Sequence, residues 1–584
     1  MAHRLRRLFF SYGLLWSVAT ALYVSCGRGS ERVGGDAEKG GEPAATGTPK
    51  TLIPEEAESL AARPRGPWRT AEEIAPPEPV AEPSPERATA GDVRTTAIAG
   101  MRDVPNVVLI VVDTMRADFT SLFPDEYDAT PFLADLAKKS VLYRNAFSTA
   151  PWTVPAMYSM MTGLFPSQHG MDAADVTPRG EIASQSILSE KAYTLAEQMR
   201  EMGYGTFGVC TNHHLAAKYG MAQGFEHFVG SAFTKLPFPE FAFEKMAPEI
   251  LASGRYFLWM HYIDPHHPYG AIHPWVDQWN HSGISGYDQL ALDIVSRYYR
   301  YEHGLPADAR LSDDAIEPIY KRAAALARLM PLPERYFIGF QLKGAPPLEG
   351  TREAKYLEFL KAAYASEIRA ADESIRDVMK RLRIDDDDLV IVTSDHGEEF
   401  MEHGRIGHRF LGSLSQELVH IPLLIKYPGN RGAGTAVEEA ASLVDIIPTI
   451  RGVLGQRSLD ELPGEDLSKR AGSVGARPQR TVFCELKEVN ESKKCAVEYP
   501  WKLLVNERSG RVRLFDIASD PNETSDISAA NPAIVERLEG ALAEWARIDV
   551  PMWKDRHSAQ LTEEEKQQLR ALGYMSSFRG DASP

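Results

Sequence analysis

The sequence predicts an α/β fold in which a large, mostly parallel β-sheet is flanked by helices. Past residue 103, short apolar runs rich in β-branched and aromatic residues alternate with stretches of helical periodicity. Continuous apolar runs are typical of strands buried on both faces, and their alternation with helices is typical of parallel sheets. In addition, polar residues suited to catalysis follow several of these runs directly.

Four apolar runs are the clearest strand candidates, and they cover residues 107–112, 206–210, 256–260 and 389–392. Each run is short and nearly continuous in its apolar character, without the polar alternation of a strand that faces water. We therefore expect all four to lie inside the sheet, covered by helices on both sides.

The stretches between these runs carry the signals of helix ends. Thr130 is in a capping position before Pro131, which is tolerated in the first turn of a helix. Thr194 and Glu197 form a capping box, and Gly203 ends the helix that follows it. A third helix is predicted from apolar residues that share one face, namely Tyr364, Ile368, Ala371, Ile375, Met379 and Leu382.

Residues 1–26 have the layout of an export signal. Arg4, Arg6 and Arg7 precede an apolar run that ends at Cys26. The segment resembles a bacterial lipoprotein signal, in which the cysteine is lipidated and becomes the mature N-terminus. An uncleaved membrane anchor is the alternative, since the run is nearly long enough to span a bilayer. In both cases we expect an exported protein that is tethered to a bacterial membrane, with its catalytic body outside the cytoplasm.

Composition separates a tether from a folded body and excludes one class of partner. Residues 27–103 are rich in Pro, Ala, Glu and Gly without periodic apolar residues, which predicts a disordered tether. The net charge of −17 argues against nucleic acid as a partner, because a phosphate-binding surface needs clustered Lys and Arg.

Besides Cys26, the only cysteines are Cys210, Cys484 and Cys495, so no disulfide scaffold is expected. Cys484 and Cys495 either pair or remain buried thiols.

Polar residues lie at the end of each predicted strand. Asp113 follows the first strand, Asn212 lies just past the second and His261 follows the third. Asp395 and His396 come shortly after the fourth. Ligands bind at the carboxyl ends of the strands in open parallel sheets, so we expect these side chains to form one site.

The residue types at this edge favour metal chemistry. Two carboxylates, Asp113 and Asp395, and the imidazole of His396 are suited to zinc, manganese or magnesium. Thr153, in the stretch APWTVPAMYSMMTG, has two interpretations: it caps a short helix, or it is a nucleophile. A cation facing its hydroxyl would favour the alkoxide, and a helix N-terminus would favour a bound phosphate or sulfate group.

Five segments carry a resemblance to a known family: PNVVLIVVDTMRAD, APWTVPAMYSMMTGLFPSQHG, HYIDPHHPY, VTSDHGEEFMEHGRIGH and LVDIIPTI. In order and spacing they resemble the sulfatase family, within the alkaline phosphatase superfamily. The resemblance implies a catalytic domain over residues 104–455, in which we expect residues 270–347 to form lid or insert loops. It also implies that residues 456–584 form a smaller C-terminal α+β subdomain and tail.

Site residues follow from the resemblance at matching positions. It implies that Asp113, Asp395 and His396 are metal ligands together with Thr153, which stands at the nucleophile position. The divalent ion is then zinc or manganese, with magnesium or calcium as alternatives.

Further residues of the expected pocket also match family positions. His266 and His408 are implied as catalytic residues that bind the transferred group or protonate the leaving oxygen. His261 and Asp264 are implied to line the substrate pocket, and Asn212 matches an asparagine often found near the site. For His267 we expect only a surface or packing role.

The departures from the family pattern bear on the reaction. Sulfatases carry Cys or Ser at the nucleophile position and convert it to formylglycine, which threonine cannot become because of its methyl group. The family's helping arginine is missing, since Met157 ends the run that starts at Thr153. Thr114 replaces the second aspartate of calcium-binding sulfatases, which fits a smaller or softer ion.

Threonine at this position resembles the superfamily's phosphodiesterases, phosphonate hydrolases and head-group transferases, in which a threonine attacks phosphorus. The leading hypothesis is therefore a metal-dependent hydrolase or head-group transferase that cleaves an anionic phosphoester through Thr153. One alternative is a sulfuric ester hydrolase that works without formylglycine. The second is an inactive anion-binding member of the family, although an inactive site has no reason to keep the complete set of metal ligands.

Overall fold

The computed structural model describes residues 104–123, 127–171, 175–176, 182–230, 235–267, 269–283, 352–408, 413–471, 479–487, 492–547 and 557–562. All of them belong to one compact unit that begins at Pro79. The predicted signal with Cys26, the predicted tether and residues 284–347 of the predicted insert lie outside the described residues. Within the described part of the chain, no helix combines the length and the apolar character that crossing a membrane requires.

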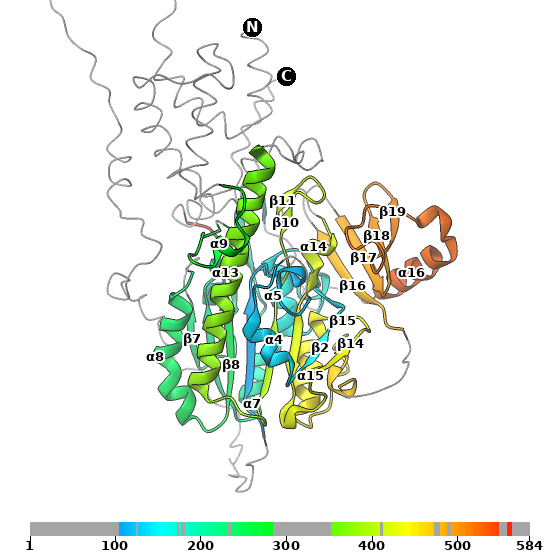
Figure 1. The fold of residues 1–584 in the computed structure, drawn as a ribbon. Helices are drawn as coiled ribbons and strands as arrows, with labels where there is room; N and C mark the ends of the chain where they lie inside the picture. Colours follow the sequence, from blue (N-terminus) through cyan, green and yellow to red (C-terminus); the bar gives the residue numbers. More distant parts are fainter. Residues whose placement is uncertain are drawn as a thin grey trace, which may run out of the picture. The chain divides into compact units, whose positions relative to one another are not determined.

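The centre of the described unit is an eight-stranded sheet, and its middle contains all four predicted strands (Figure 1). The strand order is β14 (Thr435–Val437), β2 (Val141–Tyr143), β13 (Leu423–Lys426), β9 (Leu389–Thr393), β1 (Val107–Val112), β8 (Tyr256–Tyr262), β6 (Gly205–Cys210) and β7 (His227–Gly230). The strands from β9 to β7 are parallel, whereas β13 is antiparallel to both of its neighbours. The prediction of a mostly parallel sheet is confirmed.

Helices cover the sheet because its central strands are apolar on both faces. Every residue of β1 is fully buried. Its alternate residues pack in one core with the apolar side chains of α5 (Thr153–Thr162), α7 (Leu195–Glu201) and α15 (Ile446–Val453). Two further helices, α8 (Phe238–Ala252) and α13 (Arg352–Leu382), lie side by side, and α8 packs against β6 and β8 (Figure 1).

The predicted helix signals are mostly confirmed, with one change in how a helix is capped. Thr194 and Glu197 form the capping box of α7, and the predicted apolar face of α13 is buried. Thr130 is the residue before α4 (Pro131–Ala137), but its side chain makes no capping bond. Asp372 of α13 instead accepts the backbone N–H groups of Phe132 and Leu133 at 2.8 and 3.0 Å.

The C-terminal part of the chain contains a separate antiparallel sheet of β16 (Val482–Lys487), β17 (Ser492–Glu498), β18 (Trp501–Asn506) and β19 (Arg511–Asp516). Helix α16 (Pro532–Trp545) packs against it, as an α+β subdomain requires. Cys484 and Cys495 are directly opposite in β16 and β17 and are buried free thiols. Further along, β20 (His557–Gln560) pairs with β5 (Ile182–Ile187), so this C-terminal strand lies against a segment from the first half of the chain.

Candidate active site

The site is built where β1 and β9 end side by side. Asp113 follows β1 directly, and Asp395 and His396 come shortly after β9, the parallel neighbour of β1. Nε2 of His396 lies 3.5 Å from Oδ1 of Asp113 and 3.5 Å from Oδ2 of Asp395. All three side chains are fully buried, and their ligand atoms lie close enough to hold one metal ion. These three residues are called the carboxylate site below.

The hydrogen bonds of this site leave acceptor atoms directed at its centre. The second oxygen of Asp395, Oδ1, accepts the backbone N–H of Thr114 at 3.1 Å and of His396 at 2.9 Å. Nδ1 of His396 donates to the carbonyl of Gly397 at 2.8 Å, so a neutral ring carries its lone pair on Nε2. Both Oδ1 of Asp113 and Oδ2 of Asp395 are buried without a hydrogen-bond partner among the described residues.

Those two oxygens explain why the site fits a cation. Buried carboxylate oxygens without partners are strongly destabilising unless a positive charge is near. Burial, and then the charge of Asp395, raise the pKa of Asp113 well above its usual value. Burial also raises the pKa of Asp395, although His396 opposes the shift. An oxygen-rich set with one imidazole is a donor set for a divalent ion such as zinc or manganese.

Asn212 holds the first carboxylate in place. It follows β6, and its Nδ2 donates to Oδ2 of Asp113 at 2.9 Å. Its Oδ1 accepts the backbone N–H of His214 at 3.0 Å, which fixes the orientation of the amide. Asn212, predicted from the sequence as a residue near the site, therefore supports Asp113 directly.

Thr153 lies at the same centre, and its cap interpretation is wrong. It is the first residue of α5, while Trp152 occupies the capping position and no side chain makes a capping bond there. The hydroxyl Oγ1 of Thr153 lies 3.2 Å from Nε2 of His396, and the side chain is almost fully buried. The structure thus brings together the four residues predicted as the metal set.

His261 belongs to β8 rather than to the turn after it. Its Nε2 lies 3.6 Å from Oδ2 of Asp113, so it is adjacent to the carboxylate site. Neither ring nitrogen has a hydrogen-bond partner among the described residues. Burial, followed by the charge of His396, lowers the pKa of His261 to about 3, which keeps the ring neutral.

Asp264 is buried in the turn after β8, away from these contacts. Its Oδ2 accepts the backbone N–H of Leu236 at 3.1 Å, and burial raises its pKa. Within the described part of the chain, no hydrogen bond or ion pair joins Asp264 to Asp113 or Asp395. Its role in substrate binding stays a prediction.

His266 and His408, which are far apart in the sequence, lie next to each other. Their ring centroids are 4.8 Å apart, and the ring of His408 is 4.5 Å from that of His396. Nδ1 of His408 donates to Oε1 of Glu398 at 2.9 Å. Burial lowers the pKa of His408 to about 4 and that of His266 well below its usual value. Both residues therefore line the same buried centre as Thr153.

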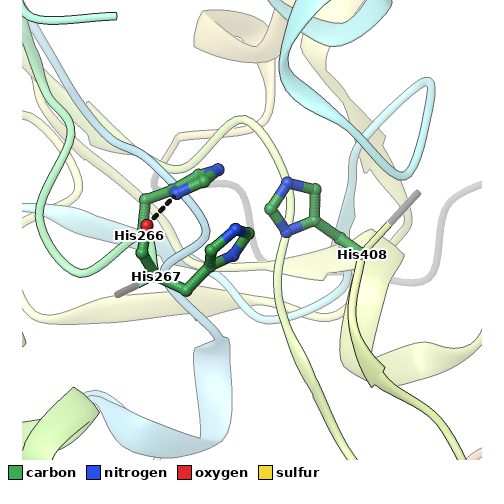
Figure 2. Close-up of side chains that lie close together, drawn as sticks. All are labelled: His266, His267 and His408. Atoms are coloured by element: carbon green, nitrogen blue, oxygen red, sulfur yellow. Dashed lines mark hydrogen bonds between the residues drawn. The ribbon is translucent and has the colours of Figure 1, made fainter. Parts of the chain in front are cut away.

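Sequence reasoning missed two members of this centre, His267 and Glu398. His267 was expected to have a surface or packing role; it is buried, with its ring 4.2 Å from that of His266 (Figure 2), which excludes the surface role. Glu398 is fully buried, and burial opposes its ionisation. His408 and then His267 outweigh that effect, so the pKa of Glu398 lies below its usual range. The only sequence signals were their positions inside the HYIDPHHPY and SDHGEE stretches.

Comparisons with known proteins give a consistent result. A family model described as Sulfatase matches residues 105–456. An ulvan-active sulfatase of Formosa agariphila is 25% identical over 62% of this chain and 64% of its own length. Arylsulfatase K of Bos taurus is 23% identical over 77% of this chain and 83% of its own length.

Solved structures show the same fold. A phosphonate monoester hydrolase from Silicibacter pomeroyi superimposes with a TM-score of 0.55 at 18% identity, over 78% of this chain and 99% of that protein. At this level of identity the similarity concerns the arrangement of helices and strands. It agrees with the predicted mostly parallel sheet and the smaller C-terminal region.

Proposed function

Since the chain belongs to the sulfatase family, we propose that it is a metal-dependent ester hydrolase that cleaves a phosphoester with Thr153 as the nucleophile. The observation that carries the proposal is the distance of 3.2 Å between Oγ1 of Thr153 and Nε2 of His396, inside the carboxylate site. A hydroxyl whose only role was packing would have no reason to lie among buried carboxylates that lack partners.

Asp113, Asp395 and His396 are the residues that would hold a divalent ion, together with Thr153. When bound, such an ion would favour the deprotonated form of a nearby hydroxyl and offset the negative charge of the ester. Zinc or manganese fits this donor set, because the residue after Asp113 is Thr114 and not a further carboxylate.

The backbone around Thr153 supports the same role. Thr153 is the first residue of α5, which has ten residues and an N-terminus that is not capped by a side chain. In the first turn Pro155 has no N–H, and the N–H of Ala156 donates to the carbonyl of Trp152 at 3.4 Å. The N–H groups of Thr153 and Val154 are therefore the ones that would favour a tetrahedral anion. The attacking hydroxyl and the anion-binding N–H groups would then belong to one turn of helix.

The test is an assay of the purified full chain, with zinc or manganese added, on four esters. These are an aryl sulfate, an aryl phosphate monoester, a bis-aryl phosphate and a phosphonate monoester. Thr153→Ala should abolish turnover of the phosphorus esters. Thr162→Ala, at the other end of the same helix, is the matched control, because the Thr162 hydroxyl bonds to nearby backbone groups, donating to the carbonyl of Tyr158 and accepting the N–H of Leu164. It should retain activity.

A sulfuric ester hydrolase without formylglycine is the second candidate, since the curated relatives named above are sulfatases. Sulfate turnover that depends on Thr153, without turnover of phosphorus esters, would replace the phosphoester proposal by this one. Product formation only in the presence of an added alcohol would instead identify a head-group transferase. Metal binding without turnover of any ester would favour an inactive anion-binding protein.

A further inference from the structure

The turn that carries Asp113 contains a threonine in an unfavourable backbone conformation. Asp113 and Thr114 are the central residues of this turn, in which the N–H of Met115 donates to the carbonyl of Val112 at 3.4 Å. Thr114 has a φ of +58°. Gly or Asn normally supplies a positive φ at the second central residue of a turn, and a β-branched residue is strained there. Such strain persists only where the surrounding structure holds it.

The backbone of Thr114 is held in place, whereas its side chain is not. Its Oγ1 is buried without a hydrogen-bond partner among the described residues. Its N–H donates to Oδ1 of Asp395 at 3.1 Å, and its carbonyl accepts the hydroxyl of Tyr364 at 2.6 Å. The turn therefore connects both carboxylates of the carboxylate site, because Asp113 belongs to it and Asp395 is bonded to it.

The hydroxyl of Tyr364, on α13, bridges two backbone groups of this segment. It donates to the carbonyl of Thr114 and accepts the N–H of Arg116 at 2.9 Å. Tyr364 is fully buried, and burial raises the pKa of its phenol well above the usual value. The hydroxyl therefore keeps its proton and remains a donor to the carbonyl.

Aromatic neighbours from three segments fix the ring of Tyr364. Its centroid is 4.8 Å from that of Phe119 in η1 (Ala117–Phe119), 5.0 Å from that of Phe400 in β10 (Glu399–Phe400) and 5.6 Å from that of Tyr269, in the segment after β8. A ring packed in this way holds its hydroxyl in one position. Phenylalanine would keep this packing and remove only the hydroxyl.

We propose that Tyr364 is a positioning residue whose hydroxyl holds the Asp113–Thr114 turn in the shape that places the two carboxylates of the carboxylate site. The inference rests on the proposed function, in which these carboxylates hold the metal ion. Without the hydroxyl, Thr114 should relax toward a negative φ, which turns its N–H relative to its carbonyl. The bond to Asp395 and the position of Asp113 would then change together.

The test is the zinc affinity of the purified full chain, measured by competition with a fluorescent zinc indicator. Tyr364→Phe should weaken zinc binding by about 10–100-fold, as the loss of other groups that orient metal ligands does. Tyr204→Phe is the matched control, because the buried Tyr204 donates to the carbonyl of Pro105 at 2.9 Å, before β1 and not after it. This control should bind zinc as tightly as the wild type.

A second substitution, at Thr114, separates positioning from packing. Glycine adopts a positive φ without steric cost, so Tyr364→Phe combined with Thr114→Gly should regain most of the lost affinity. Tyr364→Phe combined with Thr114→Ala should not, because alanine keeps the Cβ that disfavours this conformation. Both replacements remove the same hydroxyl, which has no partner among the described residues, so the comparison isolates the backbone conformation.

Amide hydrogen exchange of the metal-free chain, resolved by residue with mass spectrometry, gives an independent measurement. Tyr364→Phe should speed the exchange of the N–H groups of Thr114 and Arg116, which bond to Asp395 and to the Tyr364 hydroxyl in the wild type. Addition of Thr114→Gly should restore the protection of residue 114 only, because the acceptor for Arg116 is still absent.

Unchanged zinc affinity in Tyr364→Phe would overturn the inference. A loss of affinity that Thr114→Gly does not restore better than Thr114→Ala would overturn it as well, since it would indicate a general loss of packing.

The zinc affinities and the ester assay separate this inference from the proposed function. Restoration by Thr114→Gly in a chain whose wild type hydrolyses no ester would support the role of Tyr364 and contradict the proposed function. Ester hydrolysis by the wild type, with full zinc affinity in Tyr364→Phe, would support the proposed function and overturn the role of Tyr364.

Discussion

Oγ1 of Thr153 lies 3.2 Å from Nε2 of His396, although 243 positions separate the two residues in the chain. The contact exists because α5 begins beside the ends of β1 and β9, where Asp113, Asp395 and His396 converge. The hydroxyl of a residue in a helix is thereby placed next to the three residues that are proposed to hold a metal ion. The reactivity of Thr153 should therefore depend on its hydroxyl and not on the shape of its side chain.

Replacement of Thr153 should show whether its hydroxyl is needed for turnover and not for metal binding. Thr153→Val keeps the shape but removes the hydroxyl, so we expect kcat to fall by about 1,000-fold or more. Thr153→Ser keeps the hydroxyl and should retain measurable turnover. Steady-state kinetics with metal analysis of both variants test this, since Asp113, Asp395 and His396 should still hold the ion. Equal activity of Thr153→Val and the wild type would contradict the nucleophile assignment.

Asn212→Ala should weaken metal binding at the carboxylate site. The substitution removes the donor that holds Oδ2 of Asp113 at 2.9 Å, and such supporting bonds typically contribute about 10–100-fold in metal affinity. Competition with a chromophoric chelator measures the change. Asn145→Ala is the matched control, because Asn145 donates to the carbonyl of Glu438, outside the site. A similar loss in both variants would mean that the effect is not local.

Removal of the metal should destabilise the protein, and more so as the pH rises. In the metal-free fold, burial is the main cause that raises the pKa of Asp113, and the negative charge of Asp395 adds to it. Burial also raises the pKa of Asp395. The folded state then binds these protons more tightly than the unfolded chain does. The stability contributed by the protonated carboxyls is present below about pH 4 and is lost as the pH rises through the raised values.

Thermal unfolding of the chelated full chain between about pH 5 and pH 8 measures this dependence. Tm should fall with increasing pH, and Asp113→Asn should reduce the slope because one of the two buried charges is gone. Asp135→Asn, which removes an exposed carboxylate that pairs with Lys138, should leave the slope unchanged. A slope that Asp113→Asn does not alter would show that other groups cause the pH dependence.

Asp372→Ala should destabilise the fold without touching the active site. Asp372 accepts two backbone N–H groups at the start of α4, which no residue of α4 itself caps. Loss of both bonds should lower the free energy of unfolding by about 2 kcal/mol. Denaturant unfolding measures the change, with the exposed Asp377→Ala on the same helix as control. An unchanged midpoint would mean that water replaces the carboxylate.

Cys26→Ala tests the proposed membrane tether in the intact bacterial cell. If Cys26 is lipidated, the substitution should move the protein from the membrane fraction to the soluble fraction or block its processing, because the lipid provides the membrane affinity. Fractionation and metabolic labelling with a fatty acid measure both effects. A variant that stays in the membrane fraction at unchanged mass would instead indicate an uncleaved anchor.

The sequence alone was sufficient to predict the four central strands and the residues that form the carboxylate site. The four central strands were predicted with bounds that differ by at most two residues at either end, because continuous apolar runs are a local signal. Asp113, Asp395 and His396 were predicted as one site because parallel strands bring their carboxyl ends to a common edge. These features depend on the order of residues within short segments and on one general rule of topology.

The tertiary structure decided what depends on contacts between distant segments. Only the packing of α13 against α4 shows that Asp372, and not Thr130, satisfies the first N–H groups of α4. Only the meeting of the turn after β8 with the segment after β11 (Ile406–Gly407) brings His267 to His408. Neighbouring residues in the sequence do not encode these pairings, since they arise from the burial of apolar faces that are far apart in the chain.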